Sequence, residues 1–550
     1  MHSRGGPPGA CGNRATVVPD ALECPGAAGE VAPDETPIPE IPIVGPLRPT
    51  VCGGQDATRS GGRWPGVRIE HPRPYVTQNL KYALNPSAVA VIGASRRPTK
   101  VGYKVIEGLL KWGYRGTVYP VNPAGGTVQG LTAYPSLADV PGPVDLVFIA
   151  VPAKGVPAAV RDAAAKHAKL VAVSSSDFKE AGRGDVQDEL TRYCREHELP
   201  LIGPNFLGMG SPHFKFNCGF IPYLPVPGPV GFISQSGANL LGALGASLLR
   251  HYGMSFFVGL GNKADVDFSE FILYGGQDEH TGCIAVYIEG LDSPEAFVEA
   301  CQAVVPHKPV VVIKVGSSRQ ARKAAFAHTA SENEGMDDAF FDDVFRRAGV
   351  IRATVWQEFL DVSMALALQP PLRRDHVVMI TNGGGSGLLS CEHFDRLGMP
   401  LRPLAEMAPG LGVHLRADLP GFGSVLNPVD IAGTASPTTY ERAFTAAFED
   451  PGVDCVYGSV CPSAITNVPA IADVAVKMHE IYRHLGKALV MECQGGPECN
   501  ASIARLRDHG IPAYPTPEQA VSAIVALRKY GELRGYGDPA EAAPAHSAGR

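Results

Sequence analysis

The sequence predicts an α/β protein made of three doubly wound parallel-sheet domains in series. Short apolar runs alternate with amphipathic helical stretches, and the runs lack the polar alternation of a strand with one solvated face. Two proline-rich joints, FIPYLPVPGPV at 220–230 and LQPPLRRD at 368–375, divide the runs into three sets. A chain of 550 residues is also too long for one ordinary domain.

The expected strands follow from these runs in chain order. The first set lies at 88–95, 116–123, 144–152, 169–176 and 199–204, the second at 230–237, 254–262, 282–290 and 308–316, and the third at 377–385, 399–404, 455–460 and 488–496. The second and third sets both begin with a strand, small polar residues and an apolar-faced helix, at 228–244 and 376–394. We interpret this as a weak internal repeat of one α/β unit.

Domain boundaries follow from the joints and from the tails. Residues 1–75 are rich in Pro, Gly and Ala without a sustained period, so we expect a disordered tail there. The expected domains span 84–222, 226–368 and 374–535, and 536–550 reads as a second tail.

Composition excludes several classes of function. A net charge of −7 without long basic runs argues against a nucleic-acid binder. No apolar run reaches the ~18 residues that cross a bilayer, and the N-terminus does not read as a secretory signal. The 12 cysteines lie mainly in apolar segments, and the pair Cys493 and Cys499 lacks partners at zinc-ligand spacing. We therefore expect reduced thiols, no metal site and a cytoplasmic protein.

The first candidate site is VIGASRRPTKVGYKVIEGLL at 91–110. A strand, a glycine turn at Gly93 and a helix from about Val101 would direct backbone N–H groups toward a phosphate or pyrophosphate. The dinucleotide spacing GxGxxG is absent, because the next glycine is Gly102. The motif alone therefore fits an ordinary βα turn as well as a nucleotide site.

Two further turns occupy matching places in the repeat. Ser234, Gln235, Ser236 and Gly237 connect a strand to a helix and form either an anion cradle or a helix start capped by Ser236. The run from Thr381 to Gly387 contains Asn382, Gly383, Gly384 and Gly385, whose small size permits close approach of a ligand or simply a flexible loop.

Two ionisable residues complete the candidates. Glu289 ends an apolar strand, where the carboxylate faces either a ligand crevice or solvent. His328 lies in a small-residue loop between a basic and an acidic stretch, and is either a solvated loop residue or a nucleophile at near-neutral pH.

Together these motifs resemble the ADP-forming acyl-CoA synthetases, relatives of the succinyl-CoA synthetase α subunit. The resemblance runs from about residue 85 to 535. It depends on motifs recurring in order: VIGAS, VYPVNP, Val151–Pro152, GPN at 203–205, SQSGA, GLGNKADVD, YIEG, HT, TNGGG, NPVD at 427–430 and IPAYPTPEQAV.

The resemblance implies a Rossmann-like CoA-binding domain followed by two flavodoxin-like ligase domains. It implies that CoA contacts Gly93, Ala94, Ser95, Asn122, Pro123, Val151 and Pro152, with Lys100 as an alternative phosphate contact. It implies that His328 is transiently phosphorylated and that Glu289 holds its imidazole ring. The phosphoryl group would bind at the two helix starts, Ser234, Gln235, Ser236 and Gly237 in one and Asn382, Gly383, Gly384 and Gly385 in the other.

The implied function is that of the α-type subunit of an acid–CoA ligase, working through an acyl phosphate. The small carboxylic acid is not named by the sequence. ATP or ADP with Mg²⁺ would bind to an ATP-grasp β-type partner, because no part of the chain resembles that fold. The alternatives are a non-catalytic CoA-binding regulatory or scaffold protein and a nicotinamide oxidoreductase.

The chain also departs from the family pattern. Ala330 replaces a glycine after His-Thr, and Glu332 and Glu334 add negative charge to the same loop. Phe206 stands where relatives usually have cysteine, and Ala124 where they often have lysine. Asp177 replaces a further glycine. These differences bear on the rate of phosphorylation and on CoA binding.

Overall fold

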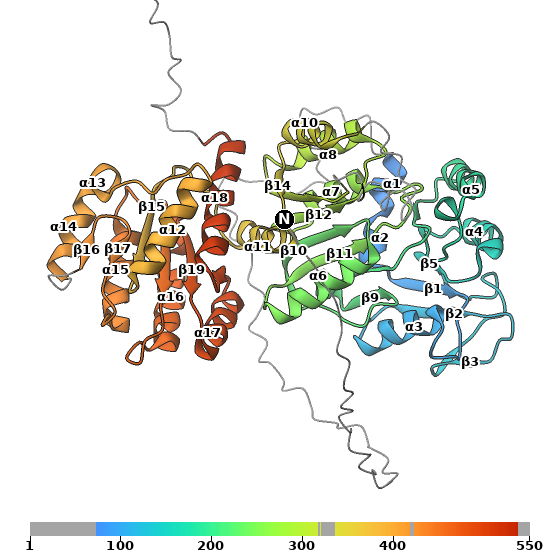
Figure 1. Ribbon diagram of the computed structural model, residues 1–550. Helices are drawn as coiled ribbons and strands as arrows, with labels where there is room; N and C mark the ends of the chain where they lie inside the picture. Colours follow the sequence, from blue (N-terminus) through green and yellow to red (C-terminus); the bar gives the residue numbers. More distant parts are fainter. Residues whose placement is uncertain (1–72, 317–319, 321–335, 419–422, 537–550) are drawn as a thin grey trace, which may run out of the picture. The chain divides into compact units, whose positions relative to one another are not determined.

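A computed structural model describes residues 73–316, 320, 336–418 and 423–536 (Figure 1). Within them the chain forms three large β-sheets in sequence order, each flanked by helices. This confirms the predicted fold class of mainly parallel α/β units. All but one of the apolar runs contain strands that are buried along nearly their whole length, which is why they lack polar alternation. The strand predicted at 399–404 is wrong: this segment forms no strand and leads into the short helix α13 (Leu404–Met407).

The first sheet has strand order β2-β1-β5-β6-β7, and all its strand pairs are parallel. Its strands are β1 (Ala88–Ile92), β2 (Thr117–Val121), β5 (Leu146–Ile149), β6 (Leu170–Val173) and β7 (Leu201–Ile202). Its helices are α3 (Val101–Lys111), α4 (Val156–Ala165) and α5 (Gly184–Glu196). A small hairpin of β3 (Thr127–Val128) and β4 (Leu131–Thr132) follows β2.

The second sheet has the order β14-β13-β12-β10-β11-β8-β9. Its parallel strands are β10 (Pro227–Ser234), β11 (Met254–Gly259), β12 (Cys283–Ile288), β13 (Val310–Lys314) and β14 (Ile351–Ala353). The antiparallel pair β8 (Gly208–Ser211) and β9 (Phe216–Gly219) extends it beyond β11. The flanking helices are α6 (Gly237–Leu249), α7 (Phe268–Gln277), α8 (Pro294–Val304), α10 (Asp338–Ala348) and α11 (Trp356–Leu368).

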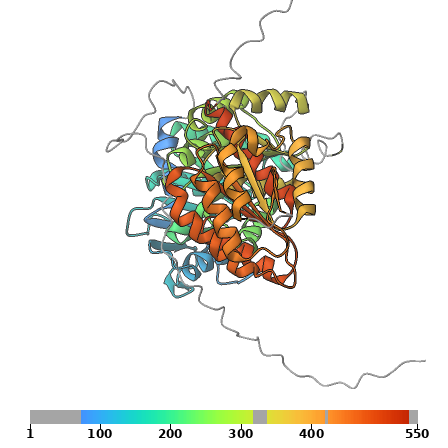
Figure 2. The same ribbon diagram turned by 90° about the vertical axis from the view of Figure 1, so that its left-hand side faces the viewer.

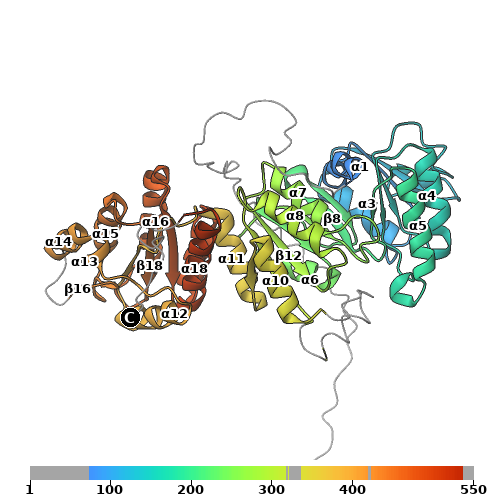
Figure 3. The ribbon, with the colours of Figure 1, turned by 90° about the horizontal axis from the view of Figure 1, so that it is seen from above.

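The third sheet has the order β16-β17-β15-β18-β19-β20 (Figure 2, orange and red). Its strands are β15 (Val377–Thr381), β16 (Ser424–Val425), β17 (Val429–Asp430), β18 (Cys455–Val460), β19 (Ala488–Cys493) and β20 (Ala513–Tyr514). Its helices are α12 (Gly384–Arg396), α13 (Leu404–Met407), α14 (Pro409–Asp418), α15 (Pro437–Glu449), α16 (Val468–Tyr482), α17 (Pro497–Asp508) and α18 (Pro517–Leu533). β18 lies between α16 on one side and α18 on the other (Figure 3).

Two features differ from the expected boundaries. β8 and β9 lie within 84–222 in sequence but belong to the second sheet, where β8 pairs with β11 and β9 pairs with β8. The expected tail 1–75 overlaps helix α1 (Pro74–Asn79), which is followed by α2 (Lys81–Leu84). Val76 in α1 is fully buried, and Arg73 forms an ion pair with the buried carboxylate of Asp265. The domain limits themselves stay a prediction.

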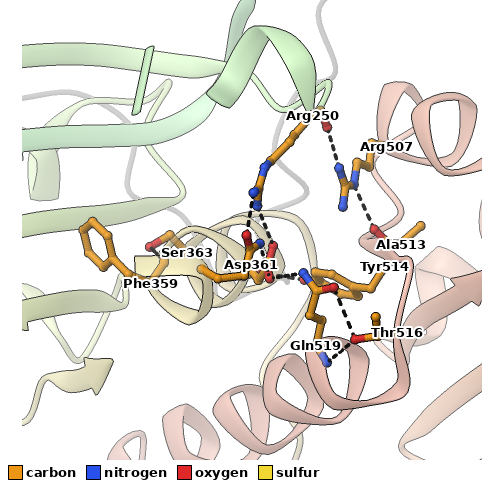
Figure 4. A network of polar contacts seen from close by, with 10 residues as sticks. Arg250, Phe359, Asp361, Ser363, Arg507, Ala513, Tyr514, Thr516 and Gln519 are labelled. Carbon is orange, nitrogen blue, oxygen red and sulfur yellow. Dashed lines mark hydrogen bonds and ion pairs between the residues drawn. The ribbon is translucent and has the colours of Figure 1, made fainter. Parts of the chain in front are cut away.

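A polar network joins the C-terminal end of α6 to the third sheet (Figure 4). Arg507 donates from Nη1 to the backbone carbonyl of Arg250 at 2.9 Å, and the Arg250 guanidinium lies 3.4 Å from the carboxylate of Asp361. Asp361 also accepts from Gln519 Nε2 at 2.6 Å through its carboxylate and from the Tyr514 hydroxyl at 2.8 Å through its backbone carbonyl. The network therefore fixes the far end of the helix whose start is a candidate phosphate site.

None of the helices in the described part of the chain combines the length and apolarity needed to cross a membrane.

Candidate active site

The loops that follow β1, β2 and β5 lie at the carboxyl edge of the first sheet. Gly93 has φ +90°, and a Cβ there would meet the carbonyl oxygen of Ala150 at 2.5 Å. A Cβ at Gly102 would meet the carbonyl oxygen of Gly93 at 2.0 Å. Helix α3 therefore begins in direct contact with the turn, and both positions require glycine. This close packing explains why the glycine spacing differs from that of a dinucleotide motif.

Asn122 connects two of these loops. Its Nδ2 donates to the carbonyl of Ala94 at 2.6 Å, and its Oδ1 accepts from the backbone N–H of Ala124 at 2.9 Å. The backbone N–H groups of Gly93 and Ala94 both donate to the carbonyl of Val121. These two amides are therefore engaged within the protein, and a phosphate in this place depends on the donors that follow them.

Those following donors lie in a basic, exposed segment. Arg96, Arg97 and Lys100 are exposed, and Arg96 donates from Nε to the carbonyl of Thr127 at 2.9 Å. The predicted residues Ser95, Pro123, Val151 and Pro152 lie in the same three loops. Lys100 was predicted for this site, and Arg96 and Arg97 precede it in the same segment, where the two arginines of VIGASRR mark it as basic.

The start of α6 is a capped helix N-terminus. The Ser236 hydroxyl accepts from the backbone N–H of Asn239 at 3.4 Å, and the Ser234 hydroxyl donates to the carbonyl of Ser236 at 2.8 Å. Both serines are at least 97% buried, with exposed fractions of 0% and 3%. Ser236 therefore caps the helix, as one of the two alternatives predicted. The backbone N–H groups of Gly237 and Ala238 still lie at this helix start, which favours anions.

Gln235 orients the segment that carries Glu289. Its Oε1 accepts from the backbone N–H groups of Glu289 at 2.8 Å and of Gly290 at 3.0 Å. Glu289 directly follows β12 and is 5% exposed. Burial and the neighbouring Glu289 carboxylate raise the pKa of the Tyr287 phenol, which also contacts the side chain of Asn239 in the first turn of α6. The Glu289 carboxylate therefore lies near the start of α6.

A buried lysine supports the same segment. Lys263 Nζ lies 2.7 Å from a carboxylate oxygen of Asp292, 3.5 Å from one of Asp267 and 3.3 Å from the carbonyl of Gly290. These two carboxylates outweigh the desolvation of the ammonium group, so the Lys263 pKa is raised. Lys263 belongs to the motif GLGNKADVD, and no role was predicted for it. The signal for its role in the sequence is a charged residue shortly after the apolar run 254–260.

The start of α12 is built differently. Gly383 occupies the N-cap position, and its N–H donates to the Thr381 hydroxyl at 3.0 Å. The Asn382 side chain exchanges hydrogen bonds with the backbone of Cys461, at 3.0 Å to the carbonyl and 2.8 Å from the N–H. An Asp430 carboxylate oxygen lies 3.0 Å from the place of a Cβ on Gly384. Gly384 and Gly385 are exposed at this helix start.

Comparisons with known proteins decide the family. The α subunit of ADP-forming acetate–CoA ligase I from Pyrococcus furiosus is 36% identical over 464 residues, which cover 83% of this chain and 98% of that protein. The chain belongs to the ADP-forming acyl-CoA ligase α-subunit family. Three family models match in order: a CoA binding domain at 87–212, a succinyl-CoA ligase like flavodoxin domain at 227–366 and a ligase-CoA domain at 377–536.

Other members of the ligase family support the assignment. A solved acetyl-coenzyme A synthetase 1 from Ca. Korarchaeum cryptofilum, described as dinucleotide forming and in complex with phosphate and ADP, has a TM-score of 0.79. It is 33% identical, and the match covers 83% of this chain and 98% of that one. ADP-forming acetate–CoA ligase I of Archaeoglobus fulgidus is 36% identical over 82% of this chain but only 63% of its own length.

Membership in the ligase family supports the catalytic alternative over the non-catalytic one, and it supports a CoA domain over a nicotinamide domain. The predicted nucleophile His328 and the departures Ala330, Glu332 and Glu334 lie outside the described residues. Among the described residues, no group of three or more His, Cys, Asp or Glu side chains is placed to hold a metal ion.

Three phenylalanines of the first two sheets and their connection belong to the core. Phe206, Phe256 and Phe257 are exposed by 1%, 1% and 0%. The Phe206 ring packs against Phe148 with centroids 5.9 Å apart. The family's usual cysteine is therefore replaced here by a residue that fills an apolar interior.

Proposed function

We propose that this chain is the α-type subunit of an ADP-forming acid–CoA ligase and that it relays a phosphoryl group through His328. The reaction converts acyl-CoA, ADP and phosphate to carboxylic acid, CoA and ATP, or the reverse, through an acyl phosphate. The observation that carries this proposal is the pair of helix starts, α6 and α12, each at the carboxyl end of a strand within its own sheet, together with the buried Glu289 beside the first.

Glu289 is the residue proposed to orient the imidazole. Gln235 binds the backbone of Glu289, and Lys263 binds the loop that follows it, so the backbone position from which the carboxylate projects is fixed. A carboxylate that accepts from one ring nitrogen leaves the other nitrogen as the nucleophile. The helix starts at Gly237 and Gly384 supply N–H groups and positive dipole ends that offset the phosphoryl charge.

The CoA site is proposed at the carboxyl edge of the first sheet. Gly93 and Gly102 allow the turn after β1 and the start of α3 to pack tightly, and Arg96, Arg97 and Lys100 supply positive charge suited to the nucleotide phosphates. Relatives carry the names of acetate, 4-hydroxybutyrate and feruloyl substrates, so the family covers carboxylic acids of very different size.

We propose that ATP or ADP and Mg²⁺ bind to an ATP-grasp β-type partner in trans. Relatives named as α subunits are matched over 98% and 97% of their length, whereas the Archaeoglobus fulgidus relative, which is not named as a subunit, is matched over 63%. The remaining third of that longer chain is the expected counterpart of the partner.

The proposal is tested by reconstitution. The purified chain alone should bind CoA in calorimetry and should not bind ATP. With an ATP-grasp partner, ATP, Mg²⁺ and a panel of carboxylic acids, it should form acyl-CoA. CoA binding without acyl-CoA formation from any acid, despite a partner shown to bind ATP, would favour the non-catalytic alternative.

A further inference from the structure

A row of polar side chains crosses the third sheet beneath α12. In the strand register Thr381 of β15 is paired with Ser459 of β18, and Ser459 is paired with Glu492 of β19. Residues paired in register on parallel strands point to the same face of the sheet. All three side chains are 0% exposed. A carboxyl group therefore ends a buried polar row whose other members are hydroxyls.

The row is linked to the start of α12 by a chain of short contacts. Glu492 Oε2 lies 3.0 Å from the hydroxyl of Ser386, which is the third residue of α12. The Ser386 hydroxyl lies 3.1 Å from that of Ser459, and the Ser459 hydroxyl lies 3.2 Å from that of Thr381. The Thr381 hydroxyl lies 3.2 Å from the carbonyl oxygen of Gly383, the N-cap residue.

The hydroxyl contacts of the row converge on the carboxyl group of Glu492. The Thr381 hydroxyl donates to that of Ser459, and the Ser386 hydroxyl lies in hydrogen-bond contact with Glu492 Oε2. The Ser459 hydroxyl also contacts the Glu492 carboxyl group. The carboxyl group is therefore held directly against the first turn of α12, and its complete burial disfavours the ionised form.

The surroundings of Glu492 also favour its neutral form. Its Oε1 has no hydrogen-bond partner among the described residues. Burial raises the pKa of Glu492 to about 7, against the lowering effect of the serine hydroxyls. The titratable groups that face it in the described chain are acids, thiols and phenols: Glu518 on α18, Cys461 after β18, Cys493 on β19, Cys499 on α17, Tyr457 on β18 and Tyr440 on α15.

We propose that Glu492 is a positioning residue for the start of α12. As a neutral acid it contacts Ser386 in the first turn of α12 without placing a charge there. When it ionises, it places a negative charge beneath the first turn, where Asp430 already contributes one carboxylate, and anion binding at this helix start weakens. The inference rests on the proposed function only in assigning a phosphoryl group to this helix start.

The first test observes the proton directly. Infrared difference spectra of the whole chain between about pH 6 and about pH 8.5 should show loss of a protonated-carboxyl band. Burial also raises the pKa of Glu270 to about 7, so the spectra are taken in a Glu270→Gln background. In that background the band should be absent when Glu492→Gln is added and retained when Glu518→Gln is added, which removes the neighbouring exposed acid. A Glu270→Gln chain without this band, or a band that persists when Glu492→Gln is added, overturns the proposal.

The second test measures anion binding at α12 and does not depend on the stability of the variant. Sulfate keeps its double charge across this pH range, so its own titration does not interfere. Protection of the amides of 383–387 from hydrogen exchange by sulfate should weaken roughly fivefold or more in wild type from pH 6 to pH 8.5. In Glu492→Gln the protection should be equal at both pH values. Equal protection in wild type contradicts the proposal.

The two tests separate this inference from the proposed function. Neither readout involves His328, CoA or the partner. A missing phosphohistidine together with a titrating Glu492 would refute the proposed function alone, and an active enzyme without the carboxyl band would refute this inference alone.

Discussion

Replacement of Gln235 by methionine tests how Glu289 is held in place. Gln235 is 3% exposed, and its Oε1 is the acceptor for two backbone N–H groups, those of Glu289 and Gly290. Methionine has nearly the same shape and no comparable acceptor. Each buried donor left without a partner costs about 1–3 kcal/mol, so the free energy of unfolding should fall by roughly 2–5 kcal/mol.

The assay combines calorimetry with hydrogen exchange. At roughly 2–4 °C per kcal/mol for a domain of this size, the transition that contains the second sheet should move down by at least about 4 °C. Amides of 284–292 should exchange faster, and acyl-CoA formation should slow by roughly tenfold or more at unchanged CoA affinity because the Glu289 carboxylate loses its fixed position. The matched variant Gln302→Met, at an exposed position on α8, should stay within about 0.5 kcal/mol of wild type. Wild-type melting and exchange in Gln235→Met would refute this account of the segment.

Three further changes have defined outcomes. Burial raises the pKa of Glu492 from 4.5 to about 7, so the folded state keeps this proton at pH values where the unfolded state has lost it. The free energy of unfolding should therefore fall by up to about 3 kcal/mol as pH rises from about 4.5 to 7. Glu492→Gln should flatten that part of the pH–stability curve, and an unchanged slope would contradict the titration. Lys263→Met leaves the carboxylates of Asp267 and Asp292 without their shared cation and should destabilise the chain by about 3 kcal/mol or more in thermal melts, whereas the surface variant Lys477→Met should have little effect. Removal of residues 1–63 should leave the melting temperature and CoA binding unchanged. Val76→Ala, in the buried face of α1, should lower the free energy of unfolding by about 1–3 kcal/mol. Equal melting temperatures of both variants and wild type would show that α1 does not contribute to stability.

The fold class could be predicted because a strand that is buried on both faces of a sheet has an apolar run in its own sequence. Runs such as 88–92 and 283–288 are apolar at successive positions, and this pattern needs no partner to be recognised. The addition of β8 and β9 to the second sheet, through the pairing of β8 with β11, could not be read in the same way. Their short runs fit either neighbouring sheet, and only long-range packing selects one.

The candidate site was predictable where the chemistry lies within one turn. Gly93, Ser236 and Gly383 mark strand-to-helix turns through local sequence alone. The roles of Gln235 and Glu492 depend on contacts with residues 54 and 106 positions away, so no local pattern signals them. Phe206 follows the GPN motif, where local sequence does not distinguish a ligand contact from a core residue, and in the structure it fills the core.

Phosphorylation of His328 is the most direct test of the central claim that this subunit relays a phosphoryl group. The chain should be incubated with an ATP-grasp partner, Mg²⁺ and ATP carrying a labelled terminal phosphate, and the product mapped by mass spectrometry under neutral and acidic conditions. The account predicts one acid-labile phosphoryl group on His328, lost in His328→Asn although that variant still binds CoA, and slowed by roughly 10²-fold in Glu289→Gln. A label that survives in His328→Asn or resists acid, or no label with a partner shown to bind ATP, would contradict it.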